Sequence, residues 1–214
     1  MRYVARRRLV KAVLATGIVG IAPARGAARL RVALLGDSLT AGFGLAPADS
    51  FPVRLQAALD GLGYAVEVLD AGVSGDTTAG GLARLDWVLG DGPDLVLVEL
   101  GANDALRGVP PESAYANLDA ILARLAEEGV AAVLAGMRAP RNLGADYVAA
   151  FDSIYPRLAD KHGVPLYPFF LDGVAFDPAL NQPDGLHPNA AGVRRIVEGI
   201  LPTLVPILDR LTGG

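Results

Sequence analysis

Five short apolar runs, separated by amphipathic stretches, constrain the fold of this chain more than any other feature of its sequence. Each run is four to seven residues long. The third and fourth are almost continuously apolar, as strands covered on both faces of a parallel sheet are. The runs are Arg31–Leu35, Val66–Leu69, Asp94–Leu100, Val130–Ala135 and Val164–Tyr167.

The stretches between the runs repeat their apolar residues with a helical period, so each is expected to form an amphipathic helix. Pro110-Pro111 before the third stretch is a helix start signal, and Gly129 after it is a stop signal. The expected helices are Phe51–Leu62, Ala79–Leu89, Glu112–Glu127, Tyr147–His162 and Ala191–Leu211.

The regular alternation of strand and helix predicts an α/β fold with right-handed crossovers. Five strands favour a flavodoxin-like three-layer sandwich, with a central five-stranded parallel sheet, over a barrel. In such sheets the ligand site lies beyond the carboxyl ends of the strands. The loops that follow the strands are therefore where chemistry is expected.

The first 24 residues differ from the rest of the chain. Five basic residues lie around and before an apolar run, Leu9–Ile21, which is followed by Ala22-Pro23-Ala24. This pattern predicts a secretory signal peptide at 1–24, a single domain at 25–214 and a periplasmic or secreted protein. An uncleaved anchor is the alternative, although the run is short for a membrane span. Arg6-Arg7 leaves both Sec and twin-arginine export open.

Charge and cysteine content exclude several function classes. Without residues 1–24, which hold five basic and no acidic groups, 14 basic residues face 23 acidic ones, a net charge of −9. We therefore expect no nucleic-acid partner and no membrane insertion after cleavage. The absence of cysteine excludes disulfides, thiolate metal sites and a cysteine nucleophile. We expect a monomer with no cofactor and no metal.

Reactive side chains follow the expected strands. Ser38 comes directly after the first, and His187 lies with Asp184 in the last loop before the final helix. A serine hydroxyl needs a base within hydrogen-bond reach, and the base needs an orienting acceptor. Asp184 can reach one nitrogen of His187 while the other faces Ser38. Asp184 could instead cap the last helix, but Asn189 can serve as that cap.

Acyl transfer also needs donors aimed at the oxygen that becomes negative. The backbone N–H of Ser38, the backbone N–H of Gly75 and the side-chain amide of Asn103 can supply them. The alternatives are a turn glycine at 75 and a loop-forming asparagine at 103. Asp37 is expected to hold the turn before Ser38 by accepting local backbone donors. His162 is expected to lie as a cation at a helix end that Gly163 stops.

Four sequence blocks resemble those of the GDSL or SGNH hydrolases, in the family's order. They are Gly36-Asp37-Ser38-Leu39, Gly75, Gly101-Ala102-Asn103-Asp104 and Asp184-Gly185-Leu186-His187-Pro188. Longer matches, such as Ser74-Gly75-Asp76-Thr77-Thr78, are similar to the bacterial acyl-CoA thioesterase I, lysophospholipase and arylesterase group. The likeness spans about residues 30 to 205, with Ala102 where the family usually has glycine.

The resemblance implies a Ser38 nucleophile, a His187 base oriented by Asp184, and an oxyanion hole of Ser38, Gly75 and Asn103. It also implies acyl thioesters, lysophospholipids and simple aryl or alkyl esters as substrates. Loops rich in apolar and small residues are expected to line an acyl groove, although ordinary loop packing explains them equally well. The substrate-binding candidates in these loops are Leu106, Arg107, Gly108 and Met137.

Other functions are compatible with parts of the pattern. A carbohydrate O-acetyl esterase and a non-catalytic binding module on the same fold both stay open. A phosphate- or flavin-binding domain is disfavoured because no G-x-x-x-x-G-K-[ST] motif exists. A phospho-acceptor receiver domain lacks its strand-end lysine, since Lys161 is the only lysine after residue 24. Thr40 breaks the G-x-S-x-G pattern of an α/β-hydrolase.

Overall fold

The computed structural model describes residues 29–213. The expected signal peptide at 1–24 lies outside the described residues. The fold is α/β, with one wholly parallel five-stranded sheet in the order β2-β1-β3-β4-β5. This confirms the predicted three-layer architecture. The strands are β1 Leu30–Gly36, β2 Val66–Gly72, β3 Leu95–Glu99, β4 Ala131–Ala135 and β5 Leu166–Tyr167.

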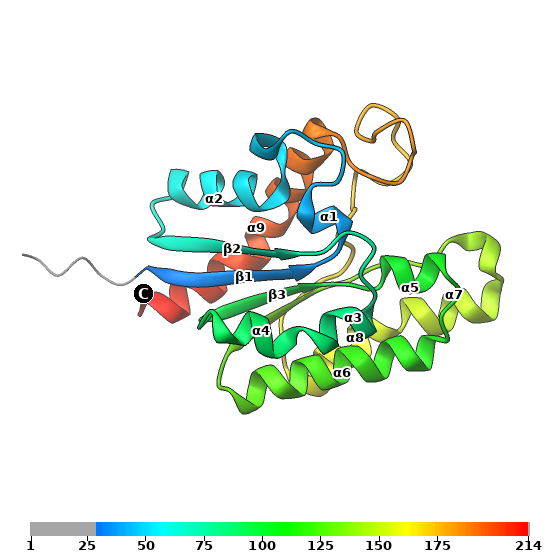
Figure 1. Cartoon of the computed structure of the whole chain (residues 1–214), viewed down its shortest axis with the longest axis horizontal. Coiled ribbons are helices and arrows are strands. Elements are labelled where there is room, and N and C mark those ends of the chain that lie inside the picture. Colours follow the sequence, from blue (N-terminus) through cyan, green and yellow to red (C-terminus); the bar gives the residue numbers. More distant parts are fainter. Residues whose placement is uncertain (1–28, 214) are drawn as a thin grey trace, which may run out of the picture.

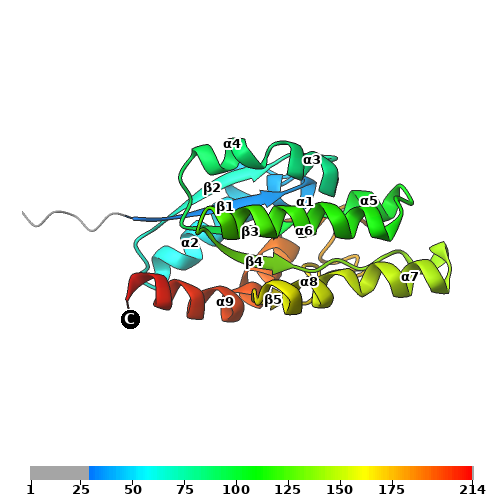
Figure 2. The ribbon, with the colours of Figure 1, turned by 90° about the horizontal axis from the view of Figure 1, so that it is seen from below.

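Helices cover both faces of the sheet (Figures 1 and 2). Helices α2 (Phe51–Gly61) and α9 (Ala190–Thr212) pack together on one face. Helices α3 (Thr78–Ala83), α4 (Leu85–Gly90), α6 (Pro111–Glu127) and α8 (Ile154–His162) cover the other. Three further helices lie at the carboxyl ends of strands or beyond them, namely α1 (Ser38–Ala41), α5 (Ala102–Leu106) and α7 (Ala145–Asp152). Short 3₁₀ helices occur at Pro47–Asp49 and Arg141–Leu143.

The burial of the strands explains their sequence. Every residue of β3 is buried, including its last residue, Glu99. Strand β1 is likewise buried from Val32 to Gly36. A strand in the middle of a sheet covered on both sides has no solvent-facing positions, so it reads as a continuous apolar run rather than an alternation. Helix α6 buries one apolar stripe against the sheet, made of Ala114, Leu118, Ile121, Leu122 and Leu125.

Two of the expected helices are each broken into two in the structure. The expected helix Ala79–Leu89 is interrupted at Arg84, whose backbone (φ −110°, ψ 7°) leaves the helical region between α3 and α4. The expected helix Tyr147–His162 is interrupted at Ser153, between α7 and α8. Pro156 explains the second break, since it has no N–H to donate to the carbonyl of Asp152.

The last strand is shorter than predicted. The expected strand began at Val164, but β5 consists of Leu166–Tyr167 only. Pro165 cannot donate to a neighbouring strand, although its carbonyl accepts from Leu134 N–H at 3.0 Å. A proline at the start of a short edge strand is the place where a sheet tolerates one. Within residues 29–213 no helix is long and apolar enough to cross a membrane.

Candidate active site

The predicted catalytic and oxyanion residues come from four separate segments, each after a strand or before the last helix, that meet at one edge of the sheet. The arrowheads of β1, β2 and β3 point toward this edge, where α1, α3 and α5 lie (Figure 1). Ser38 is the first residue of α1, directly after β1, and Gly75 lies between β2 and α3. Asn103 is in α5, after β3, and Asp184 and His187 are in the loop before α9.

Ser38, His187 and Asp184 form a hydrogen-bonded row. Ser38 Oγ lies 2.9 Å from His187 Nε2, and His187 Nδ1 lies 2.7 Å from Asp184 Oδ2. The other carboxylate oxygen, Asp184 Oδ1, accepts the backbone N–H groups of Leu186 at 2.9 Å and His187 at 3.0 Å. The row matches what a hydroxyl nucleophile requires, namely a base within reach and an acceptor behind that base.

The charge on Asp184 determines which nitrogen of His187 carries the proton. The backbone N–H of His187, then that of Leu186, then the imidazole lower the pKa of Asp184 to about 2. At neutral pH this carboxylate is ionised and can only accept hydrogen bonds. The proton of a neutral imidazole therefore sits on Nδ1, which leaves Nε2 free to accept the hydroxyl proton of Ser38.

Asn189 is the cap of the last helix. Its side-chain oxygen accepts the N–H groups of Ala191 at 2.9 Å and Gly192 at 3.1 Å. Asp184 accepts only within its own loop and from His187, so the alternative role of Asp184 as a helix cap is wrong. The satisfied cap fixes the point where the loop joins α9.

Asp37 holds the turn before Ser38, as expected, and also contacts Asn103. Its Oδ1 accepts Leu39 N–H at 2.9 Å, which caps α1, and its Oδ2 accepts the side-chain amide of Asn103 at 3.0 Å. Asp37 is fully buried. Burial raises the pKa of Asp37 to about 6, against the lowering effect of the bonds from Leu39 and Asn103.

A second buried carboxyl, Glu99, lies under this turn. Its Oε2 accepts the Thr40 hydroxyl at 2.8 Å and lies 3.5 Å from the backbone nitrogen of Asp37. Burial, and then the neighbouring Asp37, raise the pKa of Glu99 well above its usual value. A Cβ on Gly36 would lie 2.0 Å from Thr40 Oγ1, so this packing requires glycine there. The sequence analysis missed Glu99, which only interrupts an apolar run.

The loop that carries Gly75 is tied to its surroundings on both sides. Gly75 has φ +83°, a left-handed conformation that glycine adopts without strain, and its carbonyl accepts Arg107 Nη2 at 2.8 Å. Farther along, the buried Asp104 accepts both the N–H (2.8 Å) and the hydroxyl (2.6 Å) of Thr78. Asp104 thus joins α5 to α3 and holds Gly75 and Asn103 on the same edge.

The four substrate-binding candidates divide into two groups. Leu106 is 52% exposed, and Arg107 and Gly108 are also exposed, at the end of α5 beside the Gly75 loop. Met137, by contrast, is 4% exposed and packs in the hydrophobic core. The structure therefore brings Leu106, Arg107 and Gly108 to the surface near the site, whereas the burial of Met137 in the core does not fit its predicted substrate-binding role.

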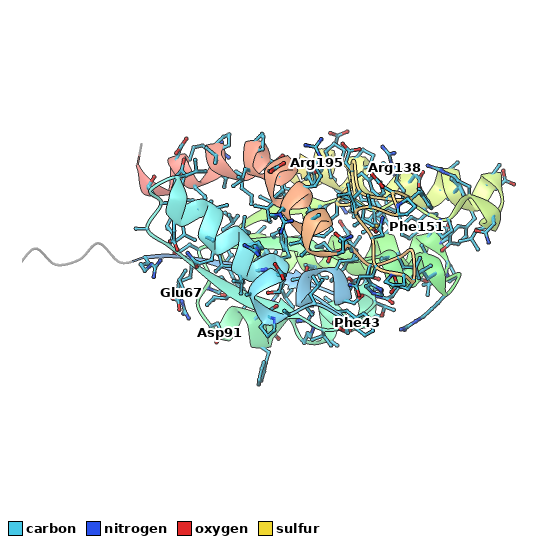
Figure 3. All side chains as sticks on the ribbon, turned by 90° about the horizontal axis from the view of Figure 1, so that it is seen from above. Phe43, Glu67, Asp91, Arg138, Phe151 and Arg195 are labelled. Carbon is cyan, nitrogen blue, oxygen red and sulfur yellow. The ribbon has the colours of Figure 1, made fainter. Side chains whose placement is uncertain are left out.

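Two residues that the sequence analysis did not single out contact the Ser38–His187 pair. The Phe43 ring lies with its centroid 4.7 Å from that of His187, and Phe43 is 52% exposed on the segment that follows α1 (Figure 3). Gln182 hydrogen-bonds to the backbone of Phe43. An aromatic residue between Gly42 and Gly44, next to the first block, was the available signal for Phe43.

The other histidine lies away from this edge, at the end of α8, where the chain turns back into β5. His162 Nε2 is 2.6 Å from Asp119 Oδ1, and Gly163 ends the helix with φ +62°. The helix-end position is as expected, and the contact with Asp119 is an additional one. Within residues 29–213 no group of three or more His, Cys, Asp or Glu side chains could hold a metal ion.

A parallel α/β sheet that carries a hydroxyl, an imidazole and a carboxylate in one hydrogen-bonded row at its carboxyl edge defines a serine hydrolase. Residues 34–195 match the model of the GDSL-like Lipase/Acylhydrolase family, and the chain belongs to that family.

Two bacterial enzymes resemble the chain over most of its length. It is 42% identical to an arylesterase of Vibrio mimicus over 176 residues, which cover 82% of this chain and 88% of that protein. It is 38% identical to thioesterase 1/protease 1/lysophospholipase L1 of Escherichia coli over 186 residues, which cover 86% of this chain and 88% of that protein. The match supports the resemblance to the thioesterase, lysophospholipase and arylesterase group.

A solved structure matches the fold at similar coverage. The psychrotrophic esterase EstA from a Pseudoalteromonas species, inhibited by monoethylphosphonate, has a TM-score of 0.79 and 31% sequence identity. The match covers 84% of this chain and 98% of that one. The fold of this chain is therefore that of a known esterase.

Proposed function

We propose that the chain is an exported serine esterase and thioesterase, which hydrolyses aryl esters, lysophospholipids and acyl-CoA through an acyl-enzyme. The single observation that carries this is the row from Ser38 Oγ to His187 Nε2 (2.9 Å) and from His187 Nδ1 to Asp184 (2.7 Å). The names of the arylesterase, thioesterase and esterase relatives support the same substrate classes.

The reaction proceeds in two steps. Ser38 Oγ attacks the acyl carbonyl while His187 Nε2 takes its proton, and the ionised Asp184 stabilises the imidazolium that forms. His187 then gives that proton to the leaving alcohol or thiol as the carbonyl re-forms, which leaves the acyl group on Ser38. In the second step His187 takes a proton from water while the hydroxide attacks the acyl carbonyl. His187 then returns that proton to Ser38 Oγ as the bond from Oγ to the acyl carbon breaks, which releases the acid and free Ser38.

Three donors are proposed for the oxyanion that forms at the carbonyl: the N–H of Ser38, the N–H of Gly75 and the side chain of Asn103. The Asn103 amide uses one N–H for its bond to Asp37 at 3.0 Å. Its second N–H is not used by that bond and can point to the substrate. Because Asp37 fixes the amide from behind, the donor is oriented before the substrate arrives, which is where such sites gain their effect.

The acyl or leaving group is proposed to lie along the end of α5. Leu106 offers exposed apolar surface there, and Arg107 and Gly108 form the adjacent turn beside Gly75. No cofactor and no metal enter this mechanism.

The place of action is proposed from the sequence. A signal peptide at 1–24 would deliver a domain of residues 25–214 to the periplasm or the medium, where it acts as a monomer. The net charge of −9 on that domain argues against a nucleic-acid partner.

The test is hydrolysis of p-nitrophenyl esters, from acetate to palmitate, by residues 25–214 and by the Ser38→Ala variant. Palmitoyl-CoA and a lysophospholipid would run alongside. We expect activity that falls by about 10⁴- to 10⁶-fold in the variant. The chain-length profile would show how long an acyl group the surface accepts. Equal rates for the two proteins on every substrate would refute the serine mechanism.

A further inference from the structure

Two separate segments must meet for Ser38 and His187 to touch. One is the nucleophile segment, residues 37–50, and the other is the histidine loop, residues 181–189. Among the described residues only two hydrogen bonds join these segments. One is the Ser38–His187 contact itself, and the other runs from Gln182 Nε2 to the carbonyl of Phe43 at 2.7 Å.

Gln182 also closes the histidine loop on itself. The same Nε2 donates to the carbonyl of Pro188 at 3.0 Å, and the backbone N–H of Gln182 donates to the carbonyl of His187 at 2.7 Å. The side-chain amide thus donates its two N–H groups to two carbonyls, that of Phe43 in the nucleophile segment and that of Pro188 in the histidine loop. The position of His187 relative to Gln182 is fixed by a bond to its own carbonyl and a bond to the carbonyl of the next residue.

The nucleophile segment is equally well tied to the point that Gln182 reaches. The N–H of Phe43 donates to the carbonyl of Ser38 at 3.0 Å, and the Phe43 ring lies against the imidazole of His187. Gly44 (φ +74°) lets the backbone come close, because a Cβ there would lie 2.3 Å from Gln182 Oε1. An unbroken set of contacts therefore runs from Ser38 through Phe43 and Gln182 to His187.

Asp184 cannot do this task. It lies three residues before His187 in the same loop, so its bond orients the imidazole but moves with the loop. The bonds that tie the histidine loop to residues 174–180 place the loop, and a contact to the nucleophile segment directly sets the distance between Nε2 and the serine hydroxyl. A displacement of about 1 Å between reacting groups can cost 10²-fold in rate, so this distance matters for catalysis.

We propose that Gln182 is a positioning residue that sets the separation of Ser38 Oγ and His187 Nε2. It touches neither the substrate nor the reacting atoms and acts through His187. The inference rests on the proposed roles of Ser38 and His187. It predicts that the hydrogen bonds of Gln182, rather than its volume, determine kcat.

Three substitutions separate these contributions. Gln182→Ala removes the side chain, whereas Gln182→Met keeps its length without hydrogen bonds. Gln182→Glu keeps its shape but points a carboxylate at two carbonyl oxygens. Gln56→Ala is the matched control, since Gln56 on α2 also bridges backbone groups, donating to Val66 O at 3.0 Å and accepting from Val68 N–H at 2.8 Å.

The measurement is kcat and KM for p-nitrophenyl butyrate, with urea unfolding midpoints for each variant. We expect all three Gln182 variants to lose about 10- to 100-fold in kcat, with KM within about twofold. Gln56→Ala should keep the kcat of the wild type, even if its unfolding midpoint falls further than those of the Gln182 variants. Wild-type kcat in Gln182→Met would overturn the proposal, because packing alone would then suffice.

A double-mutant cycle decides whether the effect passes through His187. In the His187→Ala background, where a residual rate remains, Gln182→Ala should change kcat by less than about twofold. A further 10-fold loss there would overturn the proposal and indicate general damage to the fold. If His187→Ala itself retained the wild-type rate, the proposed function would fail instead, so the two failures are distinguishable.

Discussion

The side-chain amide of Asn103 donates a hydrogen bond to the carboxylate of Asp37, at 3.0 Å, in the fully buried turn that precedes Ser38. The residue before the proposed nucleophile therefore holds a proposed oxyanion donor. The same carboxylate accepts Leu39 N–H at 2.9 Å, so one side chain both shapes the turn and orients the donor. Two parts of the site are thus coupled through a residue that takes no part in the reaction.

Asp37→Asn should lower kcat by about 10²- to 10³-fold, the cost of losing one oxyanion donor. The amide introduced at position 37 has one acceptor oxygen, whereas the carboxylate has two. Its NH₂ group therefore has to face either the N–H of Leu39 or the NH₂ of Asn103, and two donors form no hydrogen bond. Asn103 then turns away from the position in which it meets the substrate. The measurement is kcat for p-nitrophenyl butyrate in Asp37→Asn, Asn103→Ala and the double variant.

The double variant provides the control for this prediction. If Asp37 acts by orienting Asn103, the double variant should be no slower than Asn103→Ala, because both changes remove the same interaction. If the fold-losses in kcat of the two single variants multiply in the double variant, Asp37 has a separate role. Full activity in Asn103→Ala would show that the oxyanion assignment is wrong.

The stability of the protein should also depend on the protonation of Asp37. Burial raises the pKa of this carboxyl to about 6, so between about pH 4 and pH 6 the folded chain binds a proton that the unfolded chain has released. The contribution of Asp37 to the free energy of unfolding is therefore greatest below this window and falls as the pH rises through it. The loss is at most about 3 kcal/mol, from 1.36 kcal/mol per pKa unit.

Urea unfolding of the wild type and Asp37→Asn at pH 4, 5, 6 and 7 measures this effect. The difference in unfolding free energy between the two proteins should shift in favour of Asp37→Asn as the pH rises. The comparison with the variant isolates the effect of Asp37, including its effect on Glu99, whose pKa burial and then the neighbouring Asp37 raise. A difference that stays constant from pH 4 to 7 would show that Asp37 does not titrate in this range.

The predictable parts of this protein are those that a short sequence motif and the sheet topology jointly determine. Ser38 and Asn103 follow strands whose apolar runs are plain, and parallel strands bring their carboxyl ends to one edge. The local spacing of Asp184 and His187 was enough to suggest their contact, which the structure shows at 2.7 Å. In each case the relevant interaction is short in sequence or fixed by the order of the strands.

The parts that sequence analysis missed depend on tertiary contacts between distant segments. Gln182 and Phe43 are 139 residues apart, and no local pattern indicates that they touch. Glu99 at the end of an apolar strand reads as an ordinary boundary until its burial is known. The helix break at Arg84 likewise has no proline or glycine at that position to indicate it, and the contacts of its guanidinium with two strand ends are tertiary.

Asp184→Asn should lower kcat by about 10⁴-fold, by analogy with the same change in other serine triads. The amide can place its NH₂ toward Nδ1, which stabilises the imidazole tautomer that cannot accept the Ser38 proton. Backbone bonds and His187 lower the pKa of Asp184 to about 2, so its contribution to stability is complete above about pH 4 and is lost only between about pH 4 and pH 2.

The check on Asp184 combines kinetics with acid unfolding. Activity should be lost in the variant at every pH, since the carboxylate of the wild type stays ionised above pH 4. Between about pH 4 and pH 2 the wild type should lose more unfolding free energy than Asp184→Asn does. A variant with kcat within tenfold of the wild type would show that another group orients His187.

Arg84 should be needed for the geometry of the Gly75 loop as well as for stability. Its guanidinium donates to the carbonyls of Ala71 at 2.7 Å and Gly36 at 2.9 Å, and to the carboxylate of Asp76 at 2.7 Å. It thus joins the end of β2, the end of β1 and the residue after Gly75. Arg84→Ala removes three hydrogen bonds at partly buried acceptors, although the carbonyl of Gly36 keeps another donor, the N–H of Val73 at 3.0 Å, and this should cost about 2–4 kcal/mol of unfolding free energy.

Arg84→Lys separates the charge from the geometry. A lysine keeps the positive charge beside Asp76 but has no planar fork to reach three acceptors at once, so we expect it to recover part of the stability and little of the rate. For both variants kcat should fall about 10- to 100-fold, because the Gly75 N–H would no longer point toward the proposed oxyanion. Arg29→Ala, which breaks the exposed pair with Asp60, is the control and should change stability by less than about 1 kcal/mol. Wild-type kcat in Arg84→Lys would show that charge alone holds the loop and that the three-way bond is dispensable for catalysis.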